Sequence, residues 1–219
     1  PRAATQAGEG RGMTTDTANR SPQKRSGYDR ADLDFYIEPE WTVELLLDRE
    51  RFDGVTWDPA CGSGTIPAAF EARGLRCHAS DIVDRGWPGT VEHDFLSDGW
   101  VDPDRLPVEV DNIVTNPPYG RGVTARRFVN VAREIARCKV AAFVRADFLF
   151  SQGRRQLLSE AARVYVLSKR PSCPPGDPYL RGEIEAKGGQ HDYCWVVWDR
   201  DHTGKPQLDF VMPQEGGGL

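Results

Sequence analysis

Apolar residues along the chain change repeatedly between two spacings. Short apolar runs, which are typical of buried strands, are followed by longer segments whose apolar residues recur at helical spacing. A glycine at position 74 follows one of these segments, where it would end a helix. The predicted helices cover residues 40–51, 65–73, 124–137 and 152–162. The predicted strands cover residues 55–57, 76–81, 90–92, 110–115, 139–145, 164–168 and 194–199.

This alternation predicts an α/β domain. Strands that alternate with helices usually form a mostly parallel sheet with helices on both faces. We assign residues 28–213 to this single domain. Residues 1–27 contain almost no large apolar side chains, so we expect a disordered arm there, and a flexible tail at 214–219. Ligands of such sheets bind at the carboxyl ends of the strands.

The composition of the sequence gives no sign of a membrane partner, a disulfide framework or a metal site. No apolar run is long enough to cross a bilayer and no signal-peptide pattern is present, so we expect a cytoplasmic protein without a membrane partner. The five cysteines form no CxxC pair, which gives no indication of a disulfide framework or a metal site.

The charge is distributed unevenly along the chain. The net charge is −5, yet residues 120–170 carry 12 Lys and Arg against 3 Asp and Glu, a local charge of +9. A basic segment of this kind permits binding to phosphates, and solvated Arg-rich helix faces are the alternative explanation.

The first motif is Asp-Pro-Ala-Cys-Gly-Ser-Gly at residues 58–64, between a predicted strand and a predicted helix. Gly62 and Gly64 allow a tight turn and close backbone approach. The following helix start offers free N–H groups to a carboxylate, and Asp58 offers an anion to an ammonium group. Pro67 stands where a dinucleotide fingerprint requires its third glycine, so a pyrophosphate ligand is not indicated.

The heptapeptide resembles the S-adenosylmethionine (SAM) motif of SAM-dependent amino-methyltransferases. The resemblance implies a Rossmann-like, class I SAM-dependent methyltransferase fold with a seven-stranded, mostly parallel sheet. It also implies SAM as the cofactor. The implied cofactor-binding residues within the motif are Asp58, Ala60, Cys61, Gly62 and Gly64.

Two further elements would complete the cofactor site. Asp81 closes the next clear strand, where an acidic side chain can accept hydrogen bonds from ribose hydroxyls. Asp94 and Phe95 resemble the family element in which an Asp accepts from the adenine amino group of the cofactor and an aromatic ring packs on the adenine. Asp81 as a helix cap and Asp94 as a turn residue are the structural alternatives.

The second motif is Asn116-Pro117-Pro118-Tyr119, which follows a predicted strand. An exocyclic adenine amine is a poor nucleophile because its lone pair is delocalised into the ring. The Asn116 side-chain oxygen and the Pro117 carbonyl can accept its two hydrogens and direct the lone pair at the methyl group. The prolines make the backbone rigid, and Tyr119 offers a face for an extruded base.

The tetrapeptide matches the Asn-Pro-Pro-Tyr form of the family, which is typical of adenine N6 and of protein glutamine N5 methylation. We therefore predict in-line methyl transfer to adenine N6 of DNA, with the adenine flipped out of the duplex, in a setting such as restriction–modification. RNA adenine and glutamine N5 are the alternatives, although residues 1–34 cannot supply the helical domain usual in glutamine enzymes. A SAM-binding subunit without its own activity is an alternative of another class.

The remaining features are less typical of the family. Glu38-Pro39 stands where the family usually has Thr-Pro, and a glutamate there would repel the cofactor carboxylate, so Glu38 is not counted as a ligand. Tyr179 is the candidate aromatic for the target base, and Arg121 is the best-placed phosphate ligand. No segment is long enough for a large recognition domain, so a recognition partner protein is one way to achieve specificity.

Overall fold

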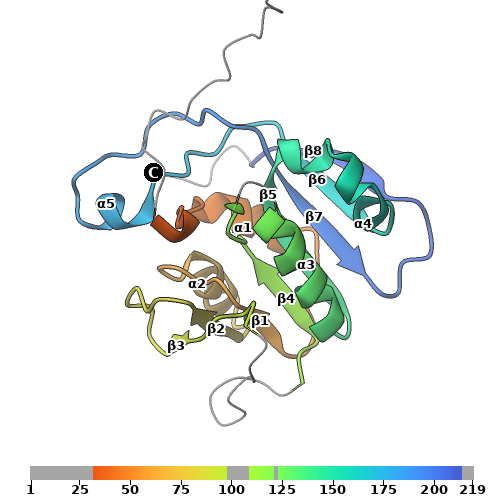
Figure 1. Ribbon diagram of the computed structural model, residues 1–219, viewed down its shortest axis with the longest axis horizontal. Helices are drawn as coiled ribbons and strands as arrows, with labels where there is room; N and C mark the ends of the chain where they lie inside the picture. The colour runs from red at the N-terminus through yellow and green to blue at the C-terminus, as the bar shows by residue number, and fades with distance from the viewer. Residues whose placement is uncertain (1–31, 98–108, 121–122, 214–219) are drawn as a thin grey trace, which may run out of the picture.

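The computed structural model describes residues 32–97, 109–120 and 123–213. The predicted arm at 1–27, the predicted tail at 214–219 and Arg121 lie outside the described residues. The strands form one eight-stranded sheet in the order β3-β2-β1-β4-β5-β7-β6-β8, with helices packed on it (Figure 1). β7 is antiparallel to both of its neighbours, and every other pair is parallel.

The elements follow the alternation that the sequence predicts. The α-helices are α1 (Glu40–Leu47), α2 (Thr65–Ala72), α3 (Val123–Ile135), α4 (Arg155–Ser159) and α5 (Gly176–Leu180). Short 3-10 helices cover Asp32–Asp34, Ala146–Leu149 and Gln152–Arg154. The strands are β1 (Thr56–Asp58), β2 (Cys77–Asp81), β3 (Val91–Glu92), β4 (Asn112–Thr115), β5 (Lys139–Arg145), β6 (Arg163–Leu167), β7 (Tyr193–Asp199) and β8 (Gln207–Val211).

Two apolar cores cover the two faces of the sheet. Side chains of α1 and α2, such as Leu46 and Phe70, pack with Phe143 and Trp195 of the sheet. Side chains of α3 and α4 pack on the opposite face, together with Trp57 and Trp198. This burial explains the run of apolar residues in β5 and β7, because a strand covered on both sides has no polar face.

The number of strands corrects the sequence prediction, which has seven. β8 was not predicted because Leu208 and Phe210 are exposed, so the strand lacks the usual buried face. It is held by parallel pairing with β6. The helix predicted over 152–162 is shorter than expected, since α4 covers only Arg155–Ser159, and α5 was also not predicted.

The register of the central strands brings their carboxyl ends together. Thr56 of β1 lies opposite both Cys77 of β2 and Asn112 of β4. Since these strands run parallel, the turns that leave β1, β2 and β4 reach the same edge of the sheet. The two sequence motifs occupy the first and the last of these turns.

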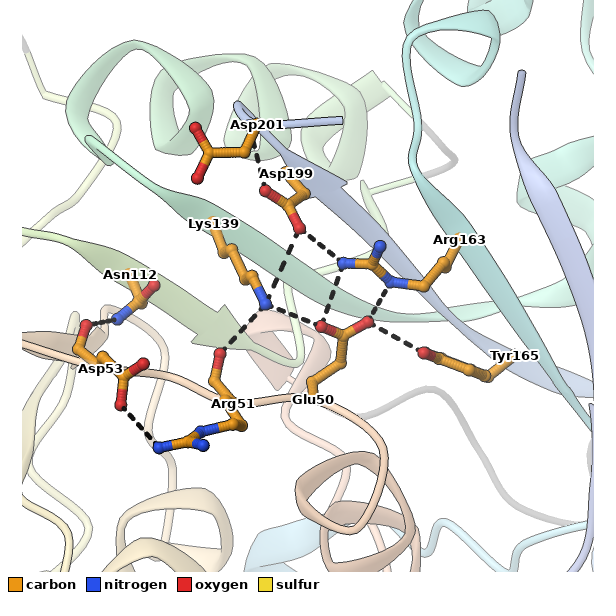
Figure 2. A network of polar contacts seen from close by, with 9 residues as sticks. All are labelled: Glu50, Arg51, Asp53, Asn112, Lys139, Arg163, Tyr165, Asp199 and Asp201. Carbon is orange, nitrogen blue, oxygen red and sulfur yellow. Dashed lines mark hydrogen bonds and ion pairs between the residues drawn. The ribbon is translucent and has the colours of Figure 1, made fainter. Parts of the chain in front are cut away.

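The opposite edge of the sheet contains a buried ion network (Figure 2). Glu50 is 5% exposed and accepts hydrogen bonds from Lys139 Nζ at 2.9 Å, from Tyr165 Oη at 2.8 Å and from the Arg163 guanidinium. Arg163 also donates to Asp199 at 2.6 Å. Two cations and a hydroxyl thus surround one carboxylate.

The described helices are too short or too polar to span a membrane. Within 32–97, 109–120 and 123–213, no helix is long and apolar enough to cross a bilayer.

Candidate active site

The turn after β1 has the conformation that its glycines permit. Gly62 and Gly64 have φ values of 53° and 92°, in the left-handed region that other residues rarely adopt. A Cβ at Gly62 would lie 2.5 Å from the ring of Phe35, and one at Gly64 would lie 2.1 Å from that of Trp87. The close neighbours that require these glycines are therefore aromatic side chains of the protein itself.

Asp81 fastens this turn to the end of β2. One carboxylate oxygen accepts from the Gly62 N–H at 2.8 Å. The other accepts from the Val83 N–H at 3.2 Å and from Arg85 Nη1 at 2.7 Å. Asp81 is thus no helix cap, and three donors already use most of the acceptor capacity available for a ribose.

Asp94 and Phe95 lie on the far wall of the same region. Asp94 is exposed, and one oxygen of its carboxylate accepts from the Leu96 N–H at 3.0 Å, which is a turn contact. Phe95 is 6% exposed and contacts Trp57 edge to face, with ring centroids 5.3 Å apart. Most of the Phe95 ring therefore belongs to the core.

Asn116 has a defined orientation at the end of β4. Its Nδ2 donates to the Glu38 carboxylate at 2.8 Å and to the Tyr36 carbonyl at 3.1 Å. Its Oδ1 accepts from Tyr119 Oη at 3.0 Å. Pro117 is buried. The tetrapeptide is therefore held by the packing of Pro117 as well as by the hydrogen bonds of Asn116.

Tyr119 occupies a different place from the one expected for a stacking ring. It packs edge to face against Tyr193, with centroids 6.5 Å apart, next to the core that contains α1 and α2. Burial raises the pKa of Tyr119 well above its ordinary value, so the hydroxyl stays protonated and can donate to Asn116.

Residues 33–38 lie across both turns and contact α5. Asp34 accepts from the Gly120 N–H at 2.7 Å, next to the tetrapeptide. The Phe35 carbonyl accepts from the Gly176 N–H at 2.9 Å, and Tyr36 forms a β-bridge with Pro175. Leu33 and Asp34 both have positive φ values, of 54° and 57°, an uncommon backbone that often occurs at functional sites.

One cavity joins these parts. Its volume is about 1030 Å³, a figure that includes space open to solvent. Residues 33–38 form one wall, and apolar side chains such as Ile82 and Phe128 form others. Of the predicted residues, the lining includes Ala60, Cys61, Gly62, Asp81, Asp94, Phe95, Asn116 and Pro118, and leaves out Asp58, Gly64, Pro117, Tyr119 and Tyr179.

The cavity wall carries closely spaced buried acids. Burial raises the pKa of Glu38 to about 7, and the hydrogen bond from Asn116 opposes this effect. Burial and the nearby charge of Glu38 together raise the pKa of Asp58, which lies beneath the turn, well above its ordinary value. Such crowding of carboxyl groups favours a ligand with positive charge.

Phe35 and Arg85 line the cavity but were not among the predicted site residues, and Glu38, which the sequence analysis placed near the cofactor without counting it as a ligand, lines it too. The Arg85 guanidinium lies 4.1 Å from the Phe35 ring centroid, and its side chain is only 7% exposed. Its Nε lies 3.9 Å from Asp177 of α5 and has no hydrogen-bond partner within the described part of the chain. No local pattern indicated Arg85, because residues 82–85 do not form the helix on which a spacing of four residues would bring it beside Asp81.

The basic segment is partly engaged within the protein. Arg126 and Arg127 donate to the carbonyls of Gly153 and Leu96, and Arg154 donates to that of Phe148 at 2.6 Å. Tyr179 is 39% exposed on α5, outside the cavity.

No family model matches the sequence, and no curated protein matches it significantly. Solved structures do resemble the fold. A modification subunit assigned to a type I restriction enzyme of Vibrio vulnificus YJ016 has 16% identity and a TM-score of 0.51, over 87% of this chain and 49% of that one. A DrdV–DNA complex has 15% identity and a TM-score of 0.53, over 82% of this chain and 28% of that one.

A Listeria monocytogenes protein assigned to the class I SAM-dependent methyltransferases has 13% identity and a TM-score of 0.48, over 78% of this chain and 62% of its own. The chain spans about half of the modification subunit and just over a quarter of the DrdV chain.

Identities this low show the fold alone. The predicted α/β fold is confirmed: the chain has a Rossmann-like fold with a mostly parallel sheet, which it shares with the modification subunit and the DrdV chain, and its sheet has eight strands in place of seven.

Proposed function

We propose that this protein is a SAM-dependent methyltransferase that methylates the N6 amino group of adenine in DNA. The observation that carries the proposal is the cavity that both motif turns line, with Cys61 and Gly62 on one side and Asn116 and Pro118 on the other. A donor held by the first turn and an amine held by the second would meet in that space, so proximity supplies much of the catalysis.

The cavity suits SAM, the cofactor that the first motif implies. Asp81 would accept from ribose hydroxyls, and Asp94 would accept from the adenine amino group. Ile82 is 51% exposed on the cavity wall and offers an apolar surface to the adenine ring. The buried acids suit a ligand with a sulfonium and an ammonium group. Bound SAM supplies a methyl group on a sulfur that leaves readily.

Asn116 would prepare the amine for attack. Tyr119 uses one lone pair of Asn116 Oδ1, which leaves the other for an amine hydrogen. The Pro117 carbonyl would accept the second hydrogen. Binding both hydrogens directs the nitrogen lone pair at the methyl group, and the rigid prolines preserve this geometry.

DNA is the polymer that the other observations favour. A modification subunit and a protein solved with DNA share the fold, and residues 120–170 are strongly basic. Adenine N6 is inaccessible inside a duplex, so the base would have to flip out. Tyr179 and Arg121 remain the candidates for contacts with the base and the phosphates. A partner protein would provide recognition.

The test is to incubate the protein with labelled SAM and, separately, duplex DNA, single-stranded DNA, RNA and a glutamine-bearing protein. We expect label on adenine N6 of DNA, located by nucleoside analysis. Label on RNA alone or on protein alone would contradict the choice of substrate. Tight SAM binding without transfer to any substrate would instead indicate a non-catalytic subunit.

A further inference from the structure

The amide of Asn116 has two ends of nearly identical shape but opposite chemistry. Only its oxygen can accept a hydrogen from an amine, whereas its NH₂ group would meet that amine donor to donor. Since the two orientations fill the same space, neighbouring hydrogen-bond partners determine which end faces the cavity.

Two acceptors hold the NH₂ end. The Tyr36 carbonyl lies 3.1 Å from Asn116 Nδ2, and a Glu38 carboxylate oxygen lies 2.8 Å from it. A charged carboxylate accepts hydrogen bonds and donates none. We propose, as an extension of the proposed function, that Glu38 is the positioning residue of the site, whose carboxylate fixes the Asn116 amide with its oxygen toward the target amine.

This role depends on the charge of Glu38. A protonated carboxyl group can donate to an amide oxygen, so Glu38 then satisfies the reversed orientation of Asn116 as well and no longer contributes to the selection, which is left to the Tyr36 carbonyl and the Tyr119 hydroxyl. Burial raises the pKa of Glu38 to about 7, so the selecting form predominates above neutral pH and is lost as pH falls. Methyl transfer should therefore increase with pH through this region.

Among the residues that the structure describes, no cation pairs with Glu38. Its charge interacts with Asp58 at the end of β1, Tyr119 after β4 and Cys173 before α5. The pKa values of all three are raised, which keeps the phenol and the thiol neutral. The other titratable residues that line the cavity are Asp34, Tyr36, Cys61, Asp81, Arg85, His93 and Asp94, and Arg85 is paired with Asp81.

The experiment compares Glu38→Gln with Glu40→Gln, an exposed neighbour at the start of α1. Glutamine keeps the size of the side chain but can donate as well as accept, so it no longer selects the amide orientation. We expect kcat to fall about tenfold, with the SAM Kd from calorimetry changed less than about twofold. The Glu40 variant should behave as the wild type.

The pH profile is the readout that a merely structural role would not move. Wild-type kcat/KM, measured from about pH 5.5 to about pH 8.5, should increase through about 7, and Glu38→Gln should lose this increase. A flat wild-type profile overturns the inference without any variant, and so does a Glu38→Gln enzyme with wild-type kcat and profile. A loss that lies entirely in SAM affinity also overturns it.

These outcomes are distinct from failure of the proposed function. A wild-type protein that transfers no methyl group to any substrate overturns the proposed function, and this inference with it. A wild-type protein that methylates DNA, alongside an unchanged Glu38→Gln enzyme, overturns the inference alone.

Discussion

The two edges of the sheet each bury a glutamate, and the two glutamates have opposite environments. Glu50 lies among Lys139, Arg163 and Tyr165, which satisfy its carboxylate completely (Figure 2). Glu38, at the edge with the cavity, has the amide of Asn116 as its side-chain donor and the carboxyl group of Asp58 as an acidic neighbour.

This difference separates stability from function. A fully paired buried carboxylate connects distant segments, here the end of α1 with β5 and β6, and it has little left to offer a ligand. An underpaired carboxylate costs stability and is retained where a ligand or a reaction uses it. The comparison therefore assigns folding to one edge of the sheet and chemistry to the other.

The largest effect should come from Glu50→Ala. Its loss leaves Lys139 and Arg163 without the carboxylate that they share, and breaking a buried pair costs about 3–5 kcal/mol. The measurement is the free energy of unfolding by denaturant. Glu44→Ala, an exposed change on α1, is the control and should cost little. A loss below about 1 kcal/mol would remove the distinction between the two edges.

Asn116→Ala tests the edge of the sheet with the cavity, where we expect a loss of catalysis and not of stability. We expect transfer to fall by at least about 100-fold, because the amine loses an acceptor that acts in the transition state. The SAM Kd and the melting temperature should stay close to wild type. Asn130→Ala, exposed on α3, is the matched control. Wild-type turnover in the Asn116 variant would refute the assigned role.

Asp81→Ala should weaken SAM binding by about tenfold, measured by calorimetry, because a ribose acceptor and the Gly62 contact disappear together. The control is Asp84→Ala, which changes an exposed acid in the following turn. Unaltered affinity in the Asp81 variant would reduce this residue to an anchor of the turn.

The smallest expected effect is on how the free energy of unfolding changes with pH. The pKa of Glu38 is about 7 in the folded protein and 4.5 as the ordinary value, so the folded state binds more protons between these values. Its contribution to stability is present at acidic pH and declines as pH rises, by about 1 kcal/mol from about pH 6 to about pH 8. Denaturant unfolding of Glu38→Gln should lack this decline, and an equal decline in both proteins would disprove the cause.

The sequence predicts what is local and misses what depends on distant partners. The two motifs could be found because each is contiguous and follows an apolar strand, and β5 was predicted with its observed ends. β8 could not be found, since its stability comes from pairing with β6 and its residues Leu208 and Phe210 face solvent. The position of Glu38 beside Asn116, 78 residues away, has no local signal.

Residues 33–38 have a consequence for the order of folding. They leave the ribosome before any strand of the sheet, yet their contacts are with Asn116, 80 residues later, and with Pro174. Contacts so distant in sequence carry a large loop-closure cost and form late. The earliest synthesised part of the described chain therefore closes the cavity last, so a nascent chain that ends before Pro174 holds both motifs without a complete binding site.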